Sequence, residues 1–270
     1  MKHDQERIRE EIKKRYGKIA ASGDPCCGPT VPCCGTKPAS TSLGYGKKDL
    51  ERIPPGSDLG LGCGNPLALA SLGEGEVVVD LGSGAGLDAF LAAERVGEKG
   101  RVIGVDMTPE MISRARRLAE EGGYTNVEFR LGEIENLPVP DGSADAVISN
   151  CVINLSTDKR RVFREAFRVL KPGGRIHLSD VVLYRELPPG MRDDMDLYAS
   201  CIAGASLLDE YLEMMAKAGF VDIRVVEERP IPWDPSLPSA CCSGGGVDPV
   251  TAGKLREWAA SVTITARKPR

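Results

Sequence analysis

The segment EVVVDLGSGAGLD, residues 76–88, constrains the fold of this chain more than any other. Three successive valines before an acidic residue are typical of a buried parallel strand, and the glycines that follow end that strand in a turn. Gly82, Gly84 and Gly86 let a ligand approach the main chain, and a helix starting at Leu87 presents free N–H groups to it. We therefore expect a nucleotide-like cofactor at this turn.

The glycine spacing argues against a nicotinamide dinucleotide. Leu87 stands where the dinucleotide fingerprint G-x-G-x-x-G has its third glycine, and neither histidine of the chain is at a predicted strand end. Asp106 follows a second predicted strand, residues 101–105, where Rossmann-type folds place the acid that accepts hydrogen bonds from ribose hydroxyls. The glycines alone could form a purely structural turn, whereas the acid at position 106 favours an adenosine ligand.

The chain alternates predicted strands and helices. After the first strand, apolar runs of strand length occur at residues 101–105, 127–131, 144–149 and 175–183. Helical patterns lie between them at residues 87–93, 110–121 and 158–170, and the turn KPGG precedes the last of these strands. This alternation predicts a doubly wound α/β fold with a parallel sheet, whose ligands bind outside the carboxyl ends of the strands. A helix near 207–218 and strands at 221–227 and 262–266 follow.

Polar side chains or thiols stand at the ends of the predicted strands. They are Asp80, Asp106, Glu133, Asn150 and Cys151. Any one of them could merely cap a turn, but five such residues at one edge of a sheet favour a binding site.

Cysteine content restricts the chemistry. The 270 residues include nine cysteines but only two histidines, His3 and His177, so histidine-based triads and histidine-rich zinc sites are nearly excluded. The N-terminal segment is too charged for a secretion signal, which predicts a cytoplasmic protein. In that setting an odd number of cysteines indicates reduced thiols rather than structural disulfides. No apolar run suits a membrane span, and 35 Lys+Arg against 39 Asp+Glu leaves no basic excess for nucleic acid.

Six cysteines form adjacent pairs in predicted loops: Cys26 with Cys27, Cys33 with Cys34, and Cys241 with Cys242. Paired thiols suit a soft metal or metalloid better than zinc, whose sites prefer C-x₂-C spacing. Exposed linkers with unreactive thiols are the alternative.

We expect three regions. Residues 1–60 hold an amphipathic helix, with Ile8, Ile12, Tyr16 and Ile19 on one face, that packs on the domain as a lid, followed by a cysteine-rich loop. Residues 61–184 form the cofactor-binding core. Residues 185–270 form a C-terminal cap region with the Cys201 loop, a helix and the last two strands.

Several motifs resemble those of S-adenosylmethionine-dependent methyltransferases, and more narrowly of arsenite methyltransferases. They are VVVDLGSGAG, VIGVDMTPEMI, GEIENLPVPDGSADAVISNCVINL and RVLKPGGRIHLSD. GCGNP, SNCVINL and YASCIAGA each carry one cysteine and separate the arsenic branch from other methyltransferases. The resemblance runs from about residue 62 to residue 220 and implies a Rossmann-like, seven-stranded sheet with a reversed last hairpin.

The resemblance also implies roles for individual residues. Asp80, Gly82, Gly84 and Gly86 would border the methionine part of S-adenosylmethionine, Asp106 the ribose, Met107 and Ile134 the adenine, and Glu133 its amino group. We add Asn150 to this set because it ends the fourth predicted strand.

The chemistry of arsenic fits the remaining cysteines, Cys63, Cys151 and Cys201. Trivalent arsenic is soft and binds thiolates, so three converging cysteines would hold it with its lone pair free to act as the nucleophile. We thus expect methylation of arsenite, free or thiol-conjugated, in arsenic detoxification, by a monomer that uses a thiol reductant of the glutathione or thioredoxin type. Each cysteine alone is more often a small buried core residue.

Two other functions stay open from the sequence. The first is a methyltransferase for a small organic molecule, with structural cysteines. The second is a metalloid-binding chaperone or sensor on a methyltransferase scaffold. The intact glycine turn together with Asp106 argues against the second, because a module that only binds metalloid need not keep both.

Overall fold

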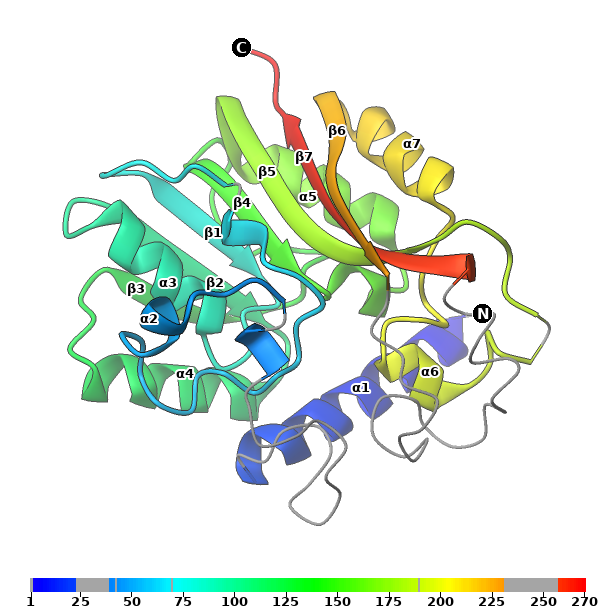
Figure 1. Cartoon of the computed structure of the whole chain (residues 1–270), viewed down its shortest axis with the longest axis horizontal. Helices are drawn as coiled ribbons and strands as arrows, with labels where there is room; N and C mark the ends of the chain where they lie inside the picture. The colour runs from blue at the N-terminus through cyan, green and yellow to red at the C-terminus, as the bar shows by residue number, and fades with distance from the viewer. Residues whose placement is uncertain (1, 23–38, 42, 69, 189, 231–256) are drawn as a thin grey trace.

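The computed structural model describes residues 2–22, 39–41, 43–68, 70–188, 190–230 and 257–270. Within these ranges seven strands form one sheet in the order β3-β2-β1-β4-β5-β7-β6 (Figure 1). The strands are β1 (Val77–Leu81), β2 (Arg101–Asp106), β3 (Val127–Leu131), β4 (Ala144–Asn150), β5 (Leu170–Leu183), β6 (Val221–Pro230) and β7 (Ala259–Arg267). Strands β1 to β5 pair in parallel, and β7 runs antiparallel to both β5 and β6. The expected doubly wound sheet with a reversed last hairpin is confirmed.

Helices cover both faces of this sheet, which explains the run of valines in β1. Val79 faces a core with α5 (Lys159–Val169) and α7 (Leu208–Ala218), whereas its neighbour Val78 faces a second core. That second core includes α3 (Leu87–Val96) and α4 (Pro109–Glu121). Since successive side chains of a strand point to opposite faces, a central strand covered on both sides must be apolar throughout.

Short elements complete the fold. They are α2 (Lys47–Leu50), α6 (Met195–Ala199) and 3₁₀ turns at Ala39–Thr41, Pro66–Ala68 and Ile153–Leu155. Asn65 caps the second of these turns, because its Oδ1 accepts a hydrogen bond from the N–H of Ala68 at 3.0 Å.

One boundary prediction was wrong. The motif KPGG was expected as a turn before a strand starting at Arg175, but β5 already begins at Leu170. Leu170 pairs with Ala144, and the register shifts before Arg175 pairs with Ala146. The glycines therefore form an irregularity inside the strand, with Gly173 at a φ of 79°.

Helix α1 (Lys2–Ser22) lies beyond the end of the sheet where β1, β4 and β5 stop (Figure 1). Ile12 is buried at 1% exposure, and the other apolar residues of the predicted face, Ile8, Tyr16 and Ile19, are partly buried against the domain. The hydroxyl of Tyr16 donates to the carbonyl oxygen of Ala199 at 3.2 Å. Among the described ranges, no helix has the length and apolar character needed to cross a membrane.

Candidate active site

A pocket lies at the carboxyl ends of the central strands and is covered by α1. Eight of the predicted site residues line it: Asp80, Gly82, Gly84, Asp106, Met107, Ile134, Asn150 and Cys151. Helix α1 contributes Arg9, Ile12 and Tyr16 to the same lining. These residues lie together because the carboxyl ends of neighbouring parallel strands meet at one edge.

Two predicted cofactor residues lie just outside the described lining. Gly86 precedes α3 with a φ of 100°, and a Cβ atom there would stand 2.6 Å from the ring of Phe90. Glu133 faces α1 instead, with its carboxylate 3.6 Å from Lys13 Nζ and 3.9 Å from Arg9 Nη1. Gly86 thus shapes the turn, and Glu133 helps to hold the helix that covers the pocket.

The glycine turn is packed tightly against the fourth strand's exit. Gly82 has a φ of 67°, and a Cβ atom at this position would lie 2.4 Å from Val152 Cγ2. Asp106 connects the turn to the second strand, since one carboxylate oxygen accepts from Gly84 N at 3.0 Å and the other from Thr108 N at 2.8 Å. Only glycine satisfies both the conformation and the space at position 82.

Four carboxylates line the pocket, those of Asp80, Asp88, Asp106 and Glu135, and the last of them lies 3.6 Å from Arg9 Nη2. Asp80 and Asp88 are buried and Asp106 is partly buried, and burial raises the pKa of each, that of Asp88 to about 6. Asp80 Oδ2 has no hydrogen-bond partner among the described residues, and Arg9 is the basic side chain in the described lining. Because buried carboxylates need compensation, the pocket is suited to a ligand that carries positive charge.

Asn150 connects this pocket to the cysteine loop. Its Oδ1 accepts from the backbone N–H of Cys63 at 3.1 Å, and its Nδ2 lies 2.9 Å from the carbonyl oxygen of Gly64. The same Nδ2 is 2.9 Å from the hydroxyl of Tyr45 and 3.1 Å from Asp88 Oδ2, and Tyr45 donates to Asp88 Oδ1 at 2.6 Å. The position of Cys63 therefore depends on side chains that also border the pocket.

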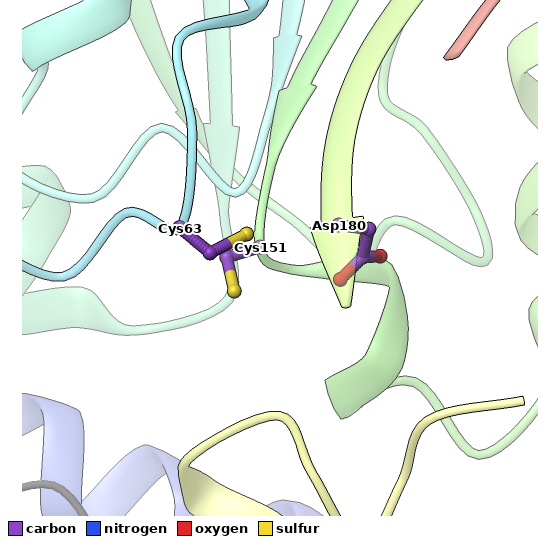
Figure 2. A group of neighbouring side chains, drawn as sticks. All are labelled: Cys63, Cys151 and Asp180. Atoms are coloured by element: carbon purple, nitrogen blue, oxygen red, sulfur yellow. The ribbon is translucent and has the colours of Figure 1, made fainter. Parts of the chain in front are cut away.

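The three single cysteines meet beside the pocket. One ligand atom from each of Cys63, Cys151 and Asp180 lies within 4.8 Å of the other two. Figure 2 shows that Cys63 comes from the loop before β1, Cys151 from the end of β4 and Asp180 from β5. Cys201 is not part of this group, but it is a neighbour of Cys151, because its thiol donates to the carbonyl oxygen of Cys151 at 2.9 Å.

The surroundings of Cys63 and Cys151 favour their protonated thiols. Burial raises the pKa of Cys63, and contacts with the thiols of Cys201 and Cys63 together with burial hold the pKa of Cys151 well above its ordinary value. Cys151 is 9% exposed and Cys201 is 3% exposed. Metalloid binding would therefore have to displace the thiol protons, as it does at other thiolate sites.

Asp180 was not predicted as a site residue. Burial raises its pKa to about 7, and its Oδ1 accepts from Asn154 Nδ2 at 2.8 Å and from Val181 N at 2.9 Å. Asp180 lies within the strand predicted at 175–183 rather than at its end, so the strand-end criterion missed it. A lone acid in the apolar run HLSDVVL is the signal that could have identified it.

Tyr45 and Asp88 were also missed. Tyr45 lies in a loop without a motif, and Asp88 is in the first turn of α3, where an acid is ordinary. The paired cysteines, Cys26, Cys27, Cys33, Cys34, Cys241 and Cys242, lie outside the described residues.

Comparisons with known proteins agree with this geometry. The family described as "Methyltransferase domain" matches residues 72–219. An arsenite methyltransferase from Halobacterium salinarum is 46% identical over 98% of this chain and 68% of its own length. Another from Aquipseudomonas alcaligenes is 40% identical over 83% of this chain and 65% of its own length. The chain thus spans about two thirds of these curated relatives.

A solved structure gives the same result. The crystal structure of an arsenic(III) S-adenosylmethionine methyltransferase from Chlamydomonas reinhardtii matches with a TM-score of 0.63 at 37% identity. The match covers 87% of this chain and 75% of that chain. The sheet, the pocket and the thiol group described above therefore belong to a member of the arsenite methyltransferase family.

Proposed function

We propose that this chain transfers a methyl group from S-adenosylmethionine to trivalent arsenic and so serves arsenic detoxification. The observation that carries the proposal is the convergence of three thiols beside a pocket lined by buried carboxylates. A methyltransferase for organic substrates has no need of three converging thiols, and a metalloid-binding protein has no need of the pocket.

The pocket fits S-adenosylmethionine by its charge. The ammonium and sulfonium groups of this molecule would compensate Asp80, whose Oδ2 lacks a partner among the described residues. S-adenosylmethionine supplies a methyl group bound to a positively charged sulfur. The lone pair of trivalent arsenic would take this methyl group and displace the sulfur.

We assign the cofactor contacts as the family resemblance implies them. Asp80 with the glycine turn takes the methionine part, Asp106 the ribose, and Met107 with Ile134 the adenine. Glu133 would have to leave its ion pairs with α1 to reach the adenine amino group. Asn150 would act on both sites, because it also holds the Cys63 loop.

Cys63, Cys151 and Cys201 are the proposed arsenic ligands. Each thiol would replace one hydroxyl of arsenite, and its proton would leave with that hydroxyl as water. The thiol of Cys201 must first turn away from the carbonyl oxygen of Cys151. The protein then contributes mainly by positioning arsenic toward the cofactor pocket, which Cys151 itself lines.

We further propose a cytoplasmic monomer that accepts arsenite or thiol-conjugated arsenite. A thiol reductant of the glutathione or thioredoxin type would return the methylated product to its trivalent state. We keep the division into an N-terminal region (1–60), a cofactor-binding core (61–184) and a C-terminal region (185–270) as part of this proposal.

Mass spectrometry of the products tests the proposal. The purified protein would be incubated with arsenite, S-adenosylmethionine and a thiol, and we expect methylated arsenic that requires all of these components. Consumption of S-adenosylmethionine on an organic acceptor without arsenic would support the small-molecule alternative. Arsenic binding without methylation would support the metalloid-binding alternative.

A further inference from the structure

Asp180 is a buried carboxylate beside the thiols to which the proposed reaction gives no task. It is 1% exposed, and one of its oxygens lies within 4.8 Å of the sulfur atoms of both Cys63 and Cys151. A carboxylate removed from water in this way is costly unless hydrogen bonds compensate it. Its surroundings therefore indicate what it does.

The hydrogen bonds around Asp180 leave part of its accepting capacity unused. Oδ1 accepts from Asn154 Nδ2 and from its neighbour's backbone, Val181 N, while Oδ2 accepts from the hydroxyl of Tyr211 at 3.1 Å. An ionised carboxylate accepts about four hydrogen bonds, and the described residues supply three. The carboxylate can thus accept one more donor, and one of its oxygens lies within 4.8 Å of the thiols of Cys63 and Cys151.

The resting arrangement of the cysteines suggests what that donor is. Cys63 and Cys151 stand together next to Asp180, whereas the thiol of Cys201 is engaged with the carbonyl oxygen of Cys151. Arsenite that meets this arrangement exchanges two hydroxyls for two thiols and releases two waters, each formed from a hydroxyl and a thiol proton. One hydroxyl then remains on arsenic.

We infer that Asp180 accepts a hydrogen bond from this remaining arsenic hydroxyl and so favours arsenite over arsenicals that already carry carbon. The inference rests on the proposed function. Asp180 is then a positioning residue that holds the hydroxyl until the third thiol replaces it. The proton of that thiol leaves with the displaced hydroxyl as water. Methylarsonous acid has only two hydroxyls and loses both to two thiols, so it has none left for Asp180.

The variant Asp180→Asn separates this role from a structural one. The amide oxygen would take the place of Oδ1 and keep the hydrogen bonds from Asn154 and Val181. The NH₂ group would then take the place of Oδ2, where it can donate but not accept. The hydroxyl of Tyr211 could accept from that NH₂ group, so the fold should be kept. The matched control is Asp145→Asn, the same change at the amino end of β4, where the carboxylate pairs with Lys171 at 2.8 Å.

The experiment measures binding of arsenite and of methylarsonous acid by equilibrium dialysis, with bound arsenic quantified by mass spectrometry. All proteins carry Cys201→Ser and have Cys26, Cys27, Cys33, Cys34, Cys241 and Cys242 changed to serine, so that Cys63 and Cys151 bind arsenic and one hydroxyl stays on arsenite. We expect Asp180→Asn to weaken arsenite binding about tenfold, the effect of one lost hydrogen bond to a charged group. The affinity of Asp180→Asn for methylarsonous acid should stay within about twofold of the parent. The affinities of Asp145→Asn for arsenite and for methylarsonous acid should do the same.

Equal weakening of both arsenicals in Asp180→Asn, or no weakening of either, would overturn the inference. If the protein with all three single cysteines bound neither arsenical, the proposed function itself would fail, so the two failures are distinguishable. Should Asp180→Asn not fold, a crystal structure of Cys201→Ser with arsenite decides: we expect the arsenic-bound oxygen within about 3 Å of the Asp180 carboxylate. An oxygen turned away from Asp180 would refute the inference.

Discussion

Under the proposed function, single side chains recognise both substrates, and Asp106 is the first example. It fixes the glycine turn through Gly84 and was predicted from its place at a strand end. We expect Asp106→Ala to weaken binding of S-adenosylmethionine by roughly 1.5–3 kcal/mol, the range for losing a charged acceptor. Titration calorimetry measures this, with Glu120→Ala on the exposed side of α4 as the control. Unchanged affinity in Asp106→Ala would contradict the assignment.

The three cysteines should differ in which arsenical they serve. Cys151 is fixed by the sheet, because its backbone N–H donates to Ser179 O at 2.8 Å, whereas Cys63 lies in a half-buried loop. Methylarsonous acid needs only two thiolates, so we expect Cys63→Ser to lose methylation of arsenite but to keep that of methylarsonous acid. Cys151→Ser and Cys201→Ser should lose both, as measured by separating the arsenic species. Equal losses on both substrates in Cys63→Ser would refute this order.

His177 should make the fold sensitive to acid. Burial, with help from Arg175 and Arg267, lowers its pKa to about 4, and its Nδ1 has no partner among the described residues. The pKa of His177 in the folded protein lies below its ordinary value of about 6.5. The contribution of His177 to stability is therefore present above pH 6.5 and is lost as the pH falls through 4.

The size of this effect is at most about 3 kcal/mol. Urea unfolding at pH 7 and pH 4.5 should show a smaller loss of stability in His177→Gln than in the unaltered protein. An equal loss in both proteins would assign the acid sensitivity to other groups.

At the scale of elements, α1 completes the pocket by packing its apolar face on the domain, and no sequence motif marks this role. Ile12 is 1% exposed and lines the pocket, so Ile12→Ala should destabilise the docked helix by about 2–4 kcal/mol. We expect faster hydrogen exchange within 2–22 and weaker binding of S-adenosylmethionine. Lys18→Ala, an exposed change in the same helix, is the control. Unchanged exchange and binding in Ile12→Ala would show that α1 does not cover the cofactor.

The elements also show how far the sequence could be interpreted. Strands β1 to β4 were predicted to within a residue, because buried parallel strands are continuous apolar runs that end in glycine or a polar residue. The start of β5 was missed because KPGG has the composition of a turn, and only pairing with Ala144 makes it part of a strand. Tyr45, Asp88 and Asp180 were missed because their roles depend on contacts between distant segments.

At the scale of the whole chain, the cysteines divide into two groups. The three single cysteines lie near one another, whereas the six paired ones are in predicted loops outside the described residues. We expect a variant with all six changed to serine to keep methyl transfer at saturating arsenite, because arsenic has only three exchangeable positions. Its activity would be compared with the unaltered protein over a range of arsenite concentrations. An inactive variant at saturation would show that the pairs take part in the reaction.

The central claim is that the methyl group of S-adenosylmethionine ends on arsenic held by the three single cysteines. The most direct measurement uses S-adenosylmethionine with a ¹³C-labelled methyl group and identifies the arsenic products by mass spectrometry. We predict labelled methylarsenic from the unaltered protein and none from Cys151→Ser, whose binding of S-adenosylmethionine should be retained. Unlabelled arsenic alone from the unaltered protein, or equal labelling in Cys151→Ser, would contradict the account.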